Sequence, residues 1–153
     1  MGYDIHRLVP DRKLVLGGEE IPYIKGLVGY SDADVLLHAL CDAILGALGL
    51  GDIGEHFPNT DPKYKDISSM ELLKEVGTLL DKKSHSVNNI DITLVMEEPR
   101  LSPFKERMRQ NIASVLKMDV DDINIKATTN EGVGSIGRVE AIAAFAVVTL
   151  ESN

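Results

Sequence analysis

Asp4 and His6 are the residues near the N-terminus whose types and spacing are best suited to chemistry. They lie two positions apart in a short alternating segment, residues 2–6, and side chains two apart on a β-strand leave the same face. His38 would join them if its segment, which has helical spacing, covers the end of that strand. One carboxylate and two imidazoles are typical ligands of a catalytic zinc ion, because three protein ligands leave the fourth position open to substrate. The alternative is that they are surface polar residues and a core histidine.

The segment around His38 also carries Asp34 and Asp42, each four positions away. Because the three side chains follow one face of a helix, we expect an acidic neighbour to hold the ring nitrogen of His38 that faces away from a metal. A solvated polar stripe is the alternative. The two other histidines, His56 and His85, lie in a loop and at a helix end, where solvated or capping roles are expected.

A second group of polar residues lies in the segment KATTNEGVGSIGRVE, residues 126–140. A predicted strand ends in Lys126, Thr128 and Thr129, and the loop after it contains Glu131 and several glycines. Backbone N–H groups and hydroxyls of such a loop can bind a phosphate, and a carboxylate can hold Mg²⁺. The segment is not a Walker A sequence, and glycines also simply form turns.

The chain is acidic, with 16 Lys and Arg against 24 Asp and Glu and a formal net charge of −8. It has no basic cluster that could follow a phosphodiester backbone, so nucleic acid is not expected as a partner. A polyanionic substrate would be repelled unless bound metal ions and local cations invert the field. Lys126, Arg138 and Arg100 are the side chains expected to help.

Three helices are expected to position these residues. The first begins at Ser31, which forms a capping-box-like pair with Asp34, and ends before the glycines at positions 49 and 51. The second begins at Ser68 or Ser69. The third begins near Pro103, since proline suits the first position of a helix, and ends at residue 116.

The strands are expected to form the other layer of the fold. A hairpin with a Gly17-Gly18 turn joins residues 13–16 and 21–24, and further strands are predicted at residues 90–96, 123–128 and 141–150. Residues 51–66 form a polar loop too long for an idle connection, so we treat it as functional. The order predicts an α+β sandwich in a single domain, residues 1–153, with a mostly antiparallel or mixed sheet covered by helices and ferredoxin-like in character.

The hydrophobic pattern of the chain bears on its cellular location. The longest apolar run, residues 141–150, is shorter than the roughly 20 residues of a membrane-spanning helix. No signal-peptide pattern opens the chain, and a cytoplasmic location is expected. The single cysteine, Cys41, cannot form an internal disulfide and lies among apolar residues, so we expect it to pack in the core.

Five segments together resemble one known family, the 2-C-methyl-D-erythritol 2,4-cyclodiphosphate synthases of the non-mevalonate isoprenoid pathway. They are GYDIH at 2–6, SDADVLLHAL at 31–40, GDIGEHFPNTDP at 51–62, EEPRLSP at 97–103 and KATTNEGVGSIGR at 126–138. The resemblance covers nearly the whole chain in the expected order. It implies a lyase that converts 4-diphosphocytidyl-2-C-methyl-D-erythritol 2-phosphate to the cyclodiphosphate plus CMP by intramolecular phosphoryl transfer.

The resemblance also implies the roles of individual residues. Asp4, His6 and His38 would bind a catalytic Zn²⁺, and Glu131 would hold a Mg²⁺ or Mn²⁺ that bridges the two phosphates. Glu131 and Thr129 are the expected catalytic residues. The residues expected to bind substrate are Ser31, Asp52, Gly54, Phe57, Asn59, Asp61, Pro99, Arg100, Leu101, Lys126, Thr128, Thr129 and Arg138.

Members of the resembled family are homotrimers with active sites shared between neighbouring subunits. A homotrimer that binds a cytidine diphosphate substrate is therefore expected here. The apolar last strand would pack around the trimer axis, where Arg138 and Glu140 would line a cavity for an isoprenoid diphosphate.

Several positions depart from the family pattern. Tyr30 stands where a histidine is common, Asn59 where an aspartate is common, and Met96 and Glu98 where smaller or basic residues are usual. The usual Arg and Gly ahead of the first strand are missing, which would shorten that strand. Two alternatives therefore remain open: a metal-dependent nucleotide-diphosphate phosphohydrolase, or a non-catalytic trimer that binds a nucleotide or an isoprenoid.

Overall fold

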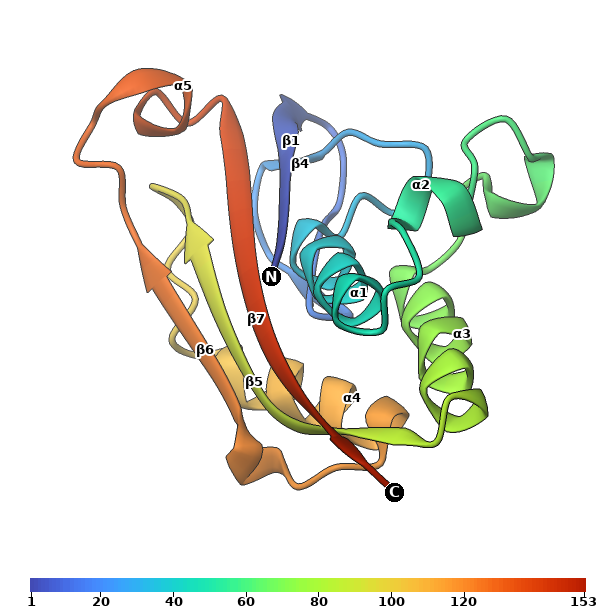
Figure 1. Cartoon of the computed structure of the whole chain (residues 1–153). Coiled ribbons are helices and arrows are strands. Elements are labelled where there is room, and N and C mark those ends of the chain that lie inside the picture. The colour runs from blue at the N-terminus through green and yellow to red at the C-terminus, as the bar shows by residue number, and fades with distance from the viewer.

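A five-stranded mixed sheet forms the centre of the computed structural model, which describes residues 1–153 (Figure 1). Its spatial order is β4-β1-β7-β5-β6. β5 and β6 are parallel, and every other neighbouring pair is antiparallel. The strands are β1 (Gly2–Pro10), β4 (Lys25–Leu27), β5 (His85–Val95), β6 (Ile123–Thr128) and β7 (Ala141–Ser152).

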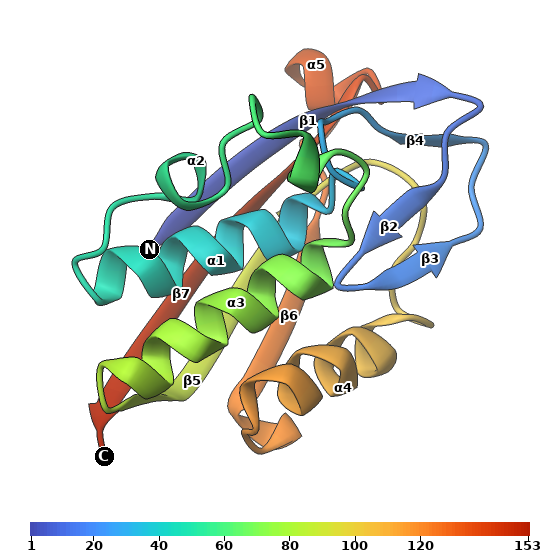
Figure 2. The ribbon, with the colours of Figure 1, turned by 90° about the vertical axis from the view of Figure 1, so that its right-hand side faces the viewer.

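Three long helices, α1 (Val35–Ala47), α3 (Ser69–Lys82) and α4 (Lys105–Leu116), lie on one face of this sheet (Figure 2). α1 packs against β1 and β7 and is buried on nearly every side, because its sequence is apolar almost throughout. α4 connects the parallel strands β5 and β6, as a parallel pair requires. The prediction of an α+β fold with a mixed sheet covered by helices is confirmed.

Short elements complete the chain. Two helices of four residues, α2 (Ile53–His56) and α5 (Gly134–Gly137), and two 3-10 turns, η1 (Pro62–Tyr64) and η2 (Val120–Asp122), lie in the connections. The polar loop at 51–66 thus contains α2 and η1. None of the helices has the length and apolar composition needed to cross a lipid bilayer. Cys41 is buried and free, as predicted.

The predicted hairpin is present as β2 (Leu14–Leu16) and β3 (Glu19–Ile21), but its second arm is shifted. Leu16 pairs directly with Glu19 across the two glycines, so the arm begins at residue 19 and the predicted strand at 21–24 is wrong. Gly17 and Gly18 have φ angles of +58° and +72°. Two consecutive positive φ values are what a two-residue hairpin turn of the right twist requires.

Two helix starts also differ from the prediction. α1 begins at Val35 rather than Ser31, because the side chain of Asp34 is itself the N-terminal cap and accepts the N–H of Leu37 at 3.1 Å. α4 begins at Lys105, so Pro103 lies outside the helix instead of at its first position. The start of α3 is confirmed, with Ser68 as its capping residue.

The strands after residue 84 agree with the prediction in place and differ in length. β6 has the predicted bounds, β7 extends two residues further, and β5 begins five residues earlier than expected. β4 has only three residues and was not predicted. β1 begins at residue 2 and runs for nine residues, so the first strand is not short.

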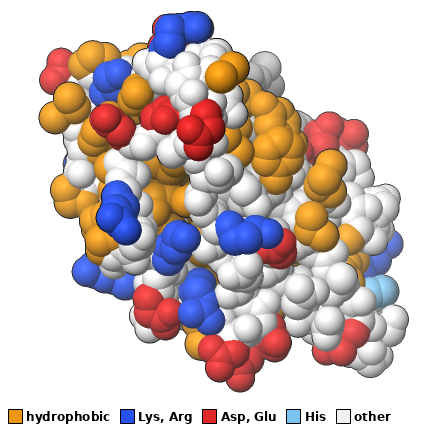
Figure 3. All heavy atoms as spheres, turned by 90° about the vertical axis from the view of Figure 1, so that its left-hand side faces the viewer, with side chains coloured by type: hydrophobic (Ala, Val, Ile, Leu, Met, Phe, Trp, Pro, Cys, Tyr) orange, Lys and Arg blue, Asp and Glu red, His pale blue; other side chains and the backbone are white.

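The helices lie on one side of the sheet, and its other face is left without a covering helix (Figure 1). Tyr3 and Ile5 of β1 and Phe145 and Val147 of β7 are 40–47% exposed on it, and the rings of Tyr3 and Phe145 lie 4.9 Å apart. Hydrophobic side chains gather on this face among charged ones (Figure 3). Exposed apolar patches of this kind mark interaction surfaces.

Gly2 allows β1 and α1 to approach closely. A Cβ atom there would clash with the carbonyl oxygen of Ala39 and lie 2.7 Å from the nitrogen of Ala43. The contact is between backbones, so no side-chain rotation could relieve it. This approach brings α1, and with it His38, against the strand that carries Asp4.

Replacing Gly2 with alanine is therefore expected to destabilise the protein. Overpacking a well-packed contact costs about 1–3 kcal/mol. In a chain of this size each kcal/mol lowers Tm by about 2–4 °C. The matched control is Gly46→Ala in α1, where nothing lies within 4 Å of the added carbon, and which should leave Tm unchanged or raise it. Equal melting temperatures for Gly2→Ala and the wild type would contradict the close packing.

Candidate metal centre and a second pocket

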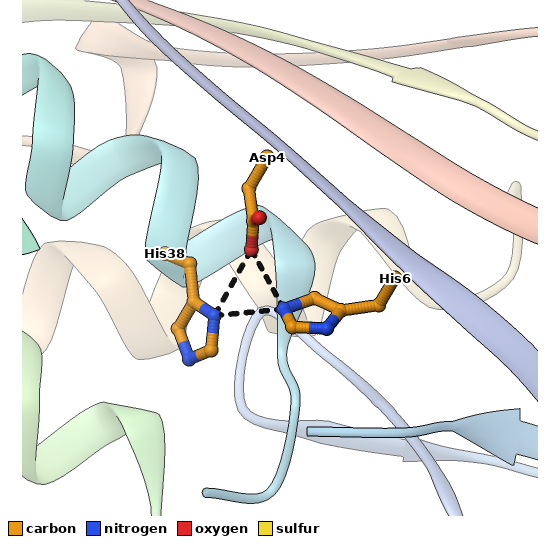
Figure 4. A group of neighbouring side chains, drawn as sticks. All are labelled: Asp4, His6 and His38. Atoms are coloured by element: carbon orange, nitrogen blue, oxygen red, sulfur yellow. Dashed lines mark hydrogen bonds and ion pairs between the residues drawn. The ribbon is translucent and has the colours of Figure 1, made fainter. Parts of the chain in front are cut away.

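Asp4, His6 and His38 converge at the boundary between β1 and α1 (Figure 4). Asp4 and His6 share one face of β1, as their spacing predicts, and His38 reaches them from α1. Asp4 Oδ2 lies 2.8 Å from His6 Nε2 and 3.0 Å from His38 Nδ1, and the two ring nitrogens are 3.1 Å apart. The structure thus brings the three predicted metal ligands together.

The second nitrogen of each ring has its own partner. His6 Nδ1 lies 2.8 Å from the carbonyl oxygen of Val28, to which it can only donate a proton. His38 Nε2 lies 3.0 Å from the hydroxyls of Ser31 and Ser69. A neutral ring with its proton on this outer nitrogen would present a lone pair to a metal ion at the centre of the triad, whereas a protonated ring also donates from its inner nitrogen to Asp4.

The donor set fits a zinc ion. Ligands at about 2.0–2.2 Å from a tetrahedral zinc are separated by roughly 3.3 Å, so the triad needs to open only slightly. Three protein atoms also leave one position for a substrate oxygen. Ser31, 7% exposed, lies beside this centre, and its contact with substrate stays a prediction.

The charges of the triad stabilise one another. Burial alone would raise the pKa of Asp4, but hydrogen bonds from His38 and His6 outweigh it and hold that pKa well below its usual range. Burial alone would lower the pKa of His6, but the hydrogen bond and the negative charge of Asp4 raise it. Asp4 therefore keeps a negative charge at the centre of the triad, which favours a bound cation.

The prediction that an acidic neighbour holds the outer nitrogen of His38 is wrong for Asp34 and Asp42. Asp34 is fully buried and accepts the N–H groups of Gly17 and Gly18 at 3.0 and 2.8 Å, which ties the β2–β3 turn to the start of α1. Its burial raises its pKa to about 6. Asp42 accepts the N–H of Ile53 at 2.7 Å and holds α2. The hydroxyl groups of Ser31 and Ser69 contact the outer nitrogen of His38 instead.

The segment 52–66 is linked to the triad through Tyr30 and its neighbour Ser31, which contacts His38. Tyr30, which precedes Ser31, donates its hydroxyl to the carbonyl oxygen of Asp61 at 3.2 Å. Its own carbonyl oxygen accepts the N–H of Asp66 at 2.9 Å. Asp52 caps α2, and Gly54 and Asn59 are exposed. The ring of Phe57 packs edge-on against Tyr64, with 5.5 Å between the centroids.

A second pocket, of about 270 Å³, lies between the segment after β5 and the end of β6. Pro99, Arg100 and Leu101 line it together with Thr128 and Thr129. The structure thus joins two of the predicted substrate segments that lie some thirty residues apart in sequence. Glu98, a departure from the family pattern, is held away by Tyr23, whose hydroxyl donates to it at 2.8 Å.

Glu97 is a functional candidate that the sequence did not reveal. Its carboxylate accepts the N–H groups of Asn130 at 2.7 Å and Gly132 at 3.3 Å, and so holds the turn that carries Glu131. Glu131 has a φ angle of +50°, and its carboxylate lies 3.4 Å from the hydroxyl of Thr129. The only sequence signal was an acidic residue in the predicted base-binding segment.

Of the three predicted cationic residues, Arg100 lines this pocket, whereas Lys126 and Arg138 form ion pairs with carboxylates. Lys126 pairs with Asp91 at 2.6 Å on the open face of the sheet. Arg138 pairs with Glu140 at 2.9 Å, and Arg100 is exposed at the rim. Both ion pairs are solvent-exposed, where such pairs contribute little and can be exchanged for a stronger anion.

The triad and the pocket lined by Pro99 and Thr128 lie apart within this chain. Two strands, β7 and β5, lie between β1 and β6, and three strand spacings amount to about 14 Å. Asp4 and His6 point toward the helices, whereas Lys126 points to the opposite, open face. Glu131 is not among the groups that meet the triad.

Comparisons with known proteins agree on one assignment. The YgbB family matches residues 1–151. A 2-C-methyl-D-erythritol 2,4-cyclodiphosphate synthase of Alkaliphilus metalliredigens is 59% identical over 150 residues, which are 98% of this chain and 94% of that protein.

Solved structures give the same result. The bifunctional IspDF of Campylobacter jejuni superposes with a TM-score of 0.95 at 46% identity, over 99% of this chain and 41% of that chain. A CDP complex of IspF from Plasmodium falciparum superposes with a TM-score of 0.88 at 34% identity, over 99% of this chain and 94% of that chain.

Protons and zinc should compete for the triad. In metal-free protein, the lowered pKa of Asp4 and the raised pKa of His6 give stability between their usual values of 3.8 and 6.5 that is lost as pH falls below or rises above this range. Zinc requires neutral His6, so the rise in Tm on adding Zn²⁺ should grow from about pH 6 to about pH 8. The measurement is thermal unfolding with and without Zn²⁺. A rise that is independent of pH, or equally large in Asp4→Ala, would contradict the assignment.

Proposed function

The chain belongs to the YgbB family, and from this premise we propose how its residues carry out the family's reaction. It is a cyclising lyase of non-mevalonate isoprenoid biosynthesis, a 2-C-methyl-D-erythritol 2,4-cyclodiphosphate synthase. Its reaction converts 4-diphosphocytidyl-2-C-methyl-D-erythritol 2-phosphate to the cyclodiphosphate and CMP. The observation that carries the residue-level proposal is the convergence of Asp4, His6 and His38 in one open triad.

Asp4, His6 and His38 hold a zinc ion, and Glu131 holds a magnesium or manganese ion. Bound there, the two ions supply positive charge to the diphosphate, which a chain of net charge −8 would otherwise repel. Two observations support this proposal. The outer ring nitrogens of His6 and His38 have hydrogen-bond partners of their own, which frees the inner nitrogens for a metal. Glu97 holds the turn that carries Glu131.

The nucleotide occupies the pocket between the segment after β5 and the end of β6. Pro99, Arg100 and Leu101 read the cytosine, and Thr128 and Thr129 donate hydroxyl hydrogen bonds to the phosphates. A family member's complex with CDP supports this class of ligand. Lys126 and Arg138 assist by exchanging their exposed carboxylate partners for the phosphates.

The methylerythritol end lies beside the triad. Ser31, Phe57, Asn59 and Asp61 contact it, and Asp52 and Gly54 contact the ribose. The loop at residues 57–66 closes over the site and excludes water, which would otherwise hydrolyse the diphosphate. Tyr30 assists by holding the carbonyl group of Asp61.

The chemical step is an intramolecular phosphoryl transfer. An oxygen of the 2-phosphate attacks the β-phosphorus, the bond from that phosphorus to the oxygen bridging to the α-phosphorus breaks, and CMP leaves with the electron pair. No side chain needs to act as a covalent nucleophile. The residues fold the substrate so that the two groups meet in line, and such positioning is worth about 7–11 kcal/mol.

The complete site forms between subunits of a homotrimer. Within one subunit the triad lies on β1 and α1, whereas the pocket lies at the end of β6 and the segment after β5, with β7 and β5 between β1 and β6. The uncovered apolar face of the sheet, with Tyr3, Ile5, Phe145 and Val147, is the surface that neighbouring subunits bury. Arg138 and Glu140, at one end of β7, line a cavity for an isoprenoid diphosphate. The single-domain organisation and the cytoplasmic location remain predictions.

Product analysis tests the reaction directly. Incubation of the substrate with protein, Zn²⁺ and Mg²⁺, followed by ³¹P NMR, should yield CMP together with the coupled signals of a cyclic diphosphate. Glu131→Ala and His38→Ala should abolish both products, whereas Glu71→Ala on the exposed side of α3 should retain them. Release of CMP with only linear phosphates would instead identify a phosphohydrolase, and binding of CDP without release a non-catalytic homologue.

Mixing two inactive variants tests the shared site. If the triad of one subunit works with Glu131 of a neighbour, Asp4→Ala and Glu131→Ala subunits, unfolded and refolded together, should regain part of the wild-type activity. Each variant refolded alone should stay inactive. A mixture that forms trimers by sedimentation yet shows no activity would place the triad and Glu131 in the same subunit.

A further inference from the structure

His38 is supported from behind by two residues that the reaction does not otherwise use. Its outer nitrogen, Nε2, lies 3.0 Å from the hydroxyl oxygen of Ser69, the first residue of α3. Ser69 is fully buried. A buried hydroxyl beside a ring nitrogen restricts which of the two atoms can carry the proton between them.

Asp32 decides the direction of that hydrogen bond. Its Oδ1 accepts the hydroxyl hydrogen of Ser69 in a short hydrogen bond, and its Oδ2 accepts the backbone N–H of the same residue at 3.0 Å. A serine hydroxyl has one hydrogen, and here it is given to the carboxylate. The oxygen of Ser69 must then accept the hydrogen of His38 Nε2. A neutral ring therefore keeps its lone pair on Nδ1, the atom that lies 3.0 Å from Asp4 Oδ2 and 3.1 Å from His6 Nε2.

Ser31 touches the same nitrogen but has a different position in the network. Its oxygen also lies 3.0 Å from His38 Nε2 and accepts the N–H of Ala33 at 3.2 Å, but no carboxylate takes its hydrogen. The hydroxyl hydrogen of Ser31 therefore stays available to a ligand. The two serines thus differ in their hydrogen bonds: the hydroxyl of Ser69 donates to Asp32, whereas the hydroxyl of Ser31 can donate to the substrate.

The backbone around Asp32 fixes this arrangement. Its N–H donates to the carbonyl oxygen of Ile67 at 3.0 Å, next to the N–H of Asp66 that donates to Tyr30. These bonds join the segment before α1 to the segment before α3. Both ends of the Asp32–Ser69 pair are therefore held independently of the histidine that they contact.

We propose that Asp32 and Ser69 are positioning residues that fix the tautomer and orientation of His38 for metal binding. The inference rests on the zinc site proposed above and adds the residues that prepare it. Carboxylate-linked partners of this kind make a ligating histidine more basic and hold its ring, and their loss lowers metal affinity by about 10–100-fold. Neither residue touches substrate or the reacting atoms.

The test is zinc affinity, measured by competition with a chromophoric chelator. Ser69→Ala should weaken zinc binding by about 10–100-fold, and Asp32→Asn, which removes the charge and one acceptor, should act in the same direction. The matched control is Ser68→Ala, which removes the cap of α3 at the neighbouring position without touching His38. Its affinity should equal that of the wild type although its Tm falls.

A second readout reports the tautomer. In zinc-loaded protein labelled with ¹⁵N at histidine, His38 should show a protonated Nε2 and a metal-shifted Nδ1, and Ser69→Ala should broaden or shift the Nε2–H signal. Ser69→Thr retains the hydroxyl and should restore affinity toward the wild-type value. Thermal unfolding identifies any variant that fails to fold, and Asp32→Asn then serves as the independent measurement.

The outcomes separate this inference from the zinc site itself. If the wild type binds no more zinc than His38→Ala, the proposed zinc site is wrong. If the wild type binds zinc and His38→Ala does not, but Ser69→Ala and Asp32→Asn bind as tightly as the wild type, only the positioning role is overturned. Weakening by Ser69→Ala alone would also overturn it, because the carboxylate would then have no part.

Discussion

The close approach of α1 to β1 is the constraint on which the site depends. It requires a residue without a side chain at Gly2, since any Cβ there would strike the backbone of the helix. It also requires a fixed start for α1, which Asp34 provides by capping the helix and holding the β2–β3 turn at once. With the helix so placed, one side chain from α1 meets two from β1. The convergence of Asp4, His6 and His38 is thus a consequence of backbone packing and one buried carboxylate.

Much of this could be predicted from the sequence because the signals are local. Asp4 and His6 share a face through the two-residue period of a strand, and the apolar repeat around His38 specifies its helix. What surrounds them could not be predicted. Ser69 lies 31 residues from His38 and Glu97 lies 35 from Gly132, and no periodicity links residues that meet only in space. The start of α1 was misplaced for the same reason, since Ser31 resembles a cap but contacts His38 instead.

The departures from the family pattern are accommodated by local contacts. Tyr30 uses its hydroxyl to hold the backbone of the loop at residue 61, and Glu98 accepts a hydrogen bond from Tyr23. Met96 is buried in the core. None of these residues contacts the triad, whose nearest partners are a backbone carbonyl and two serines. Metal ions held by the proposed site residues would offset locally the net charge of −8 that repels a diphosphate.

The central claim is that one subunit supplies the metal triad and its neighbour the nucleotide pocket. The most direct measurement is anomalous X-ray diffraction at the zinc edge from crystals grown with Zn²⁺ and CDP. The account predicts one anomalous peak per subunit, bonded to Asp4, His6 and His38, with the diphosphate of a CDP held by Thr128 and Thr129 of the adjacent subunit. A peak elsewhere, or a nucleotide bound by the pocket and triad of the same subunit, would contradict it.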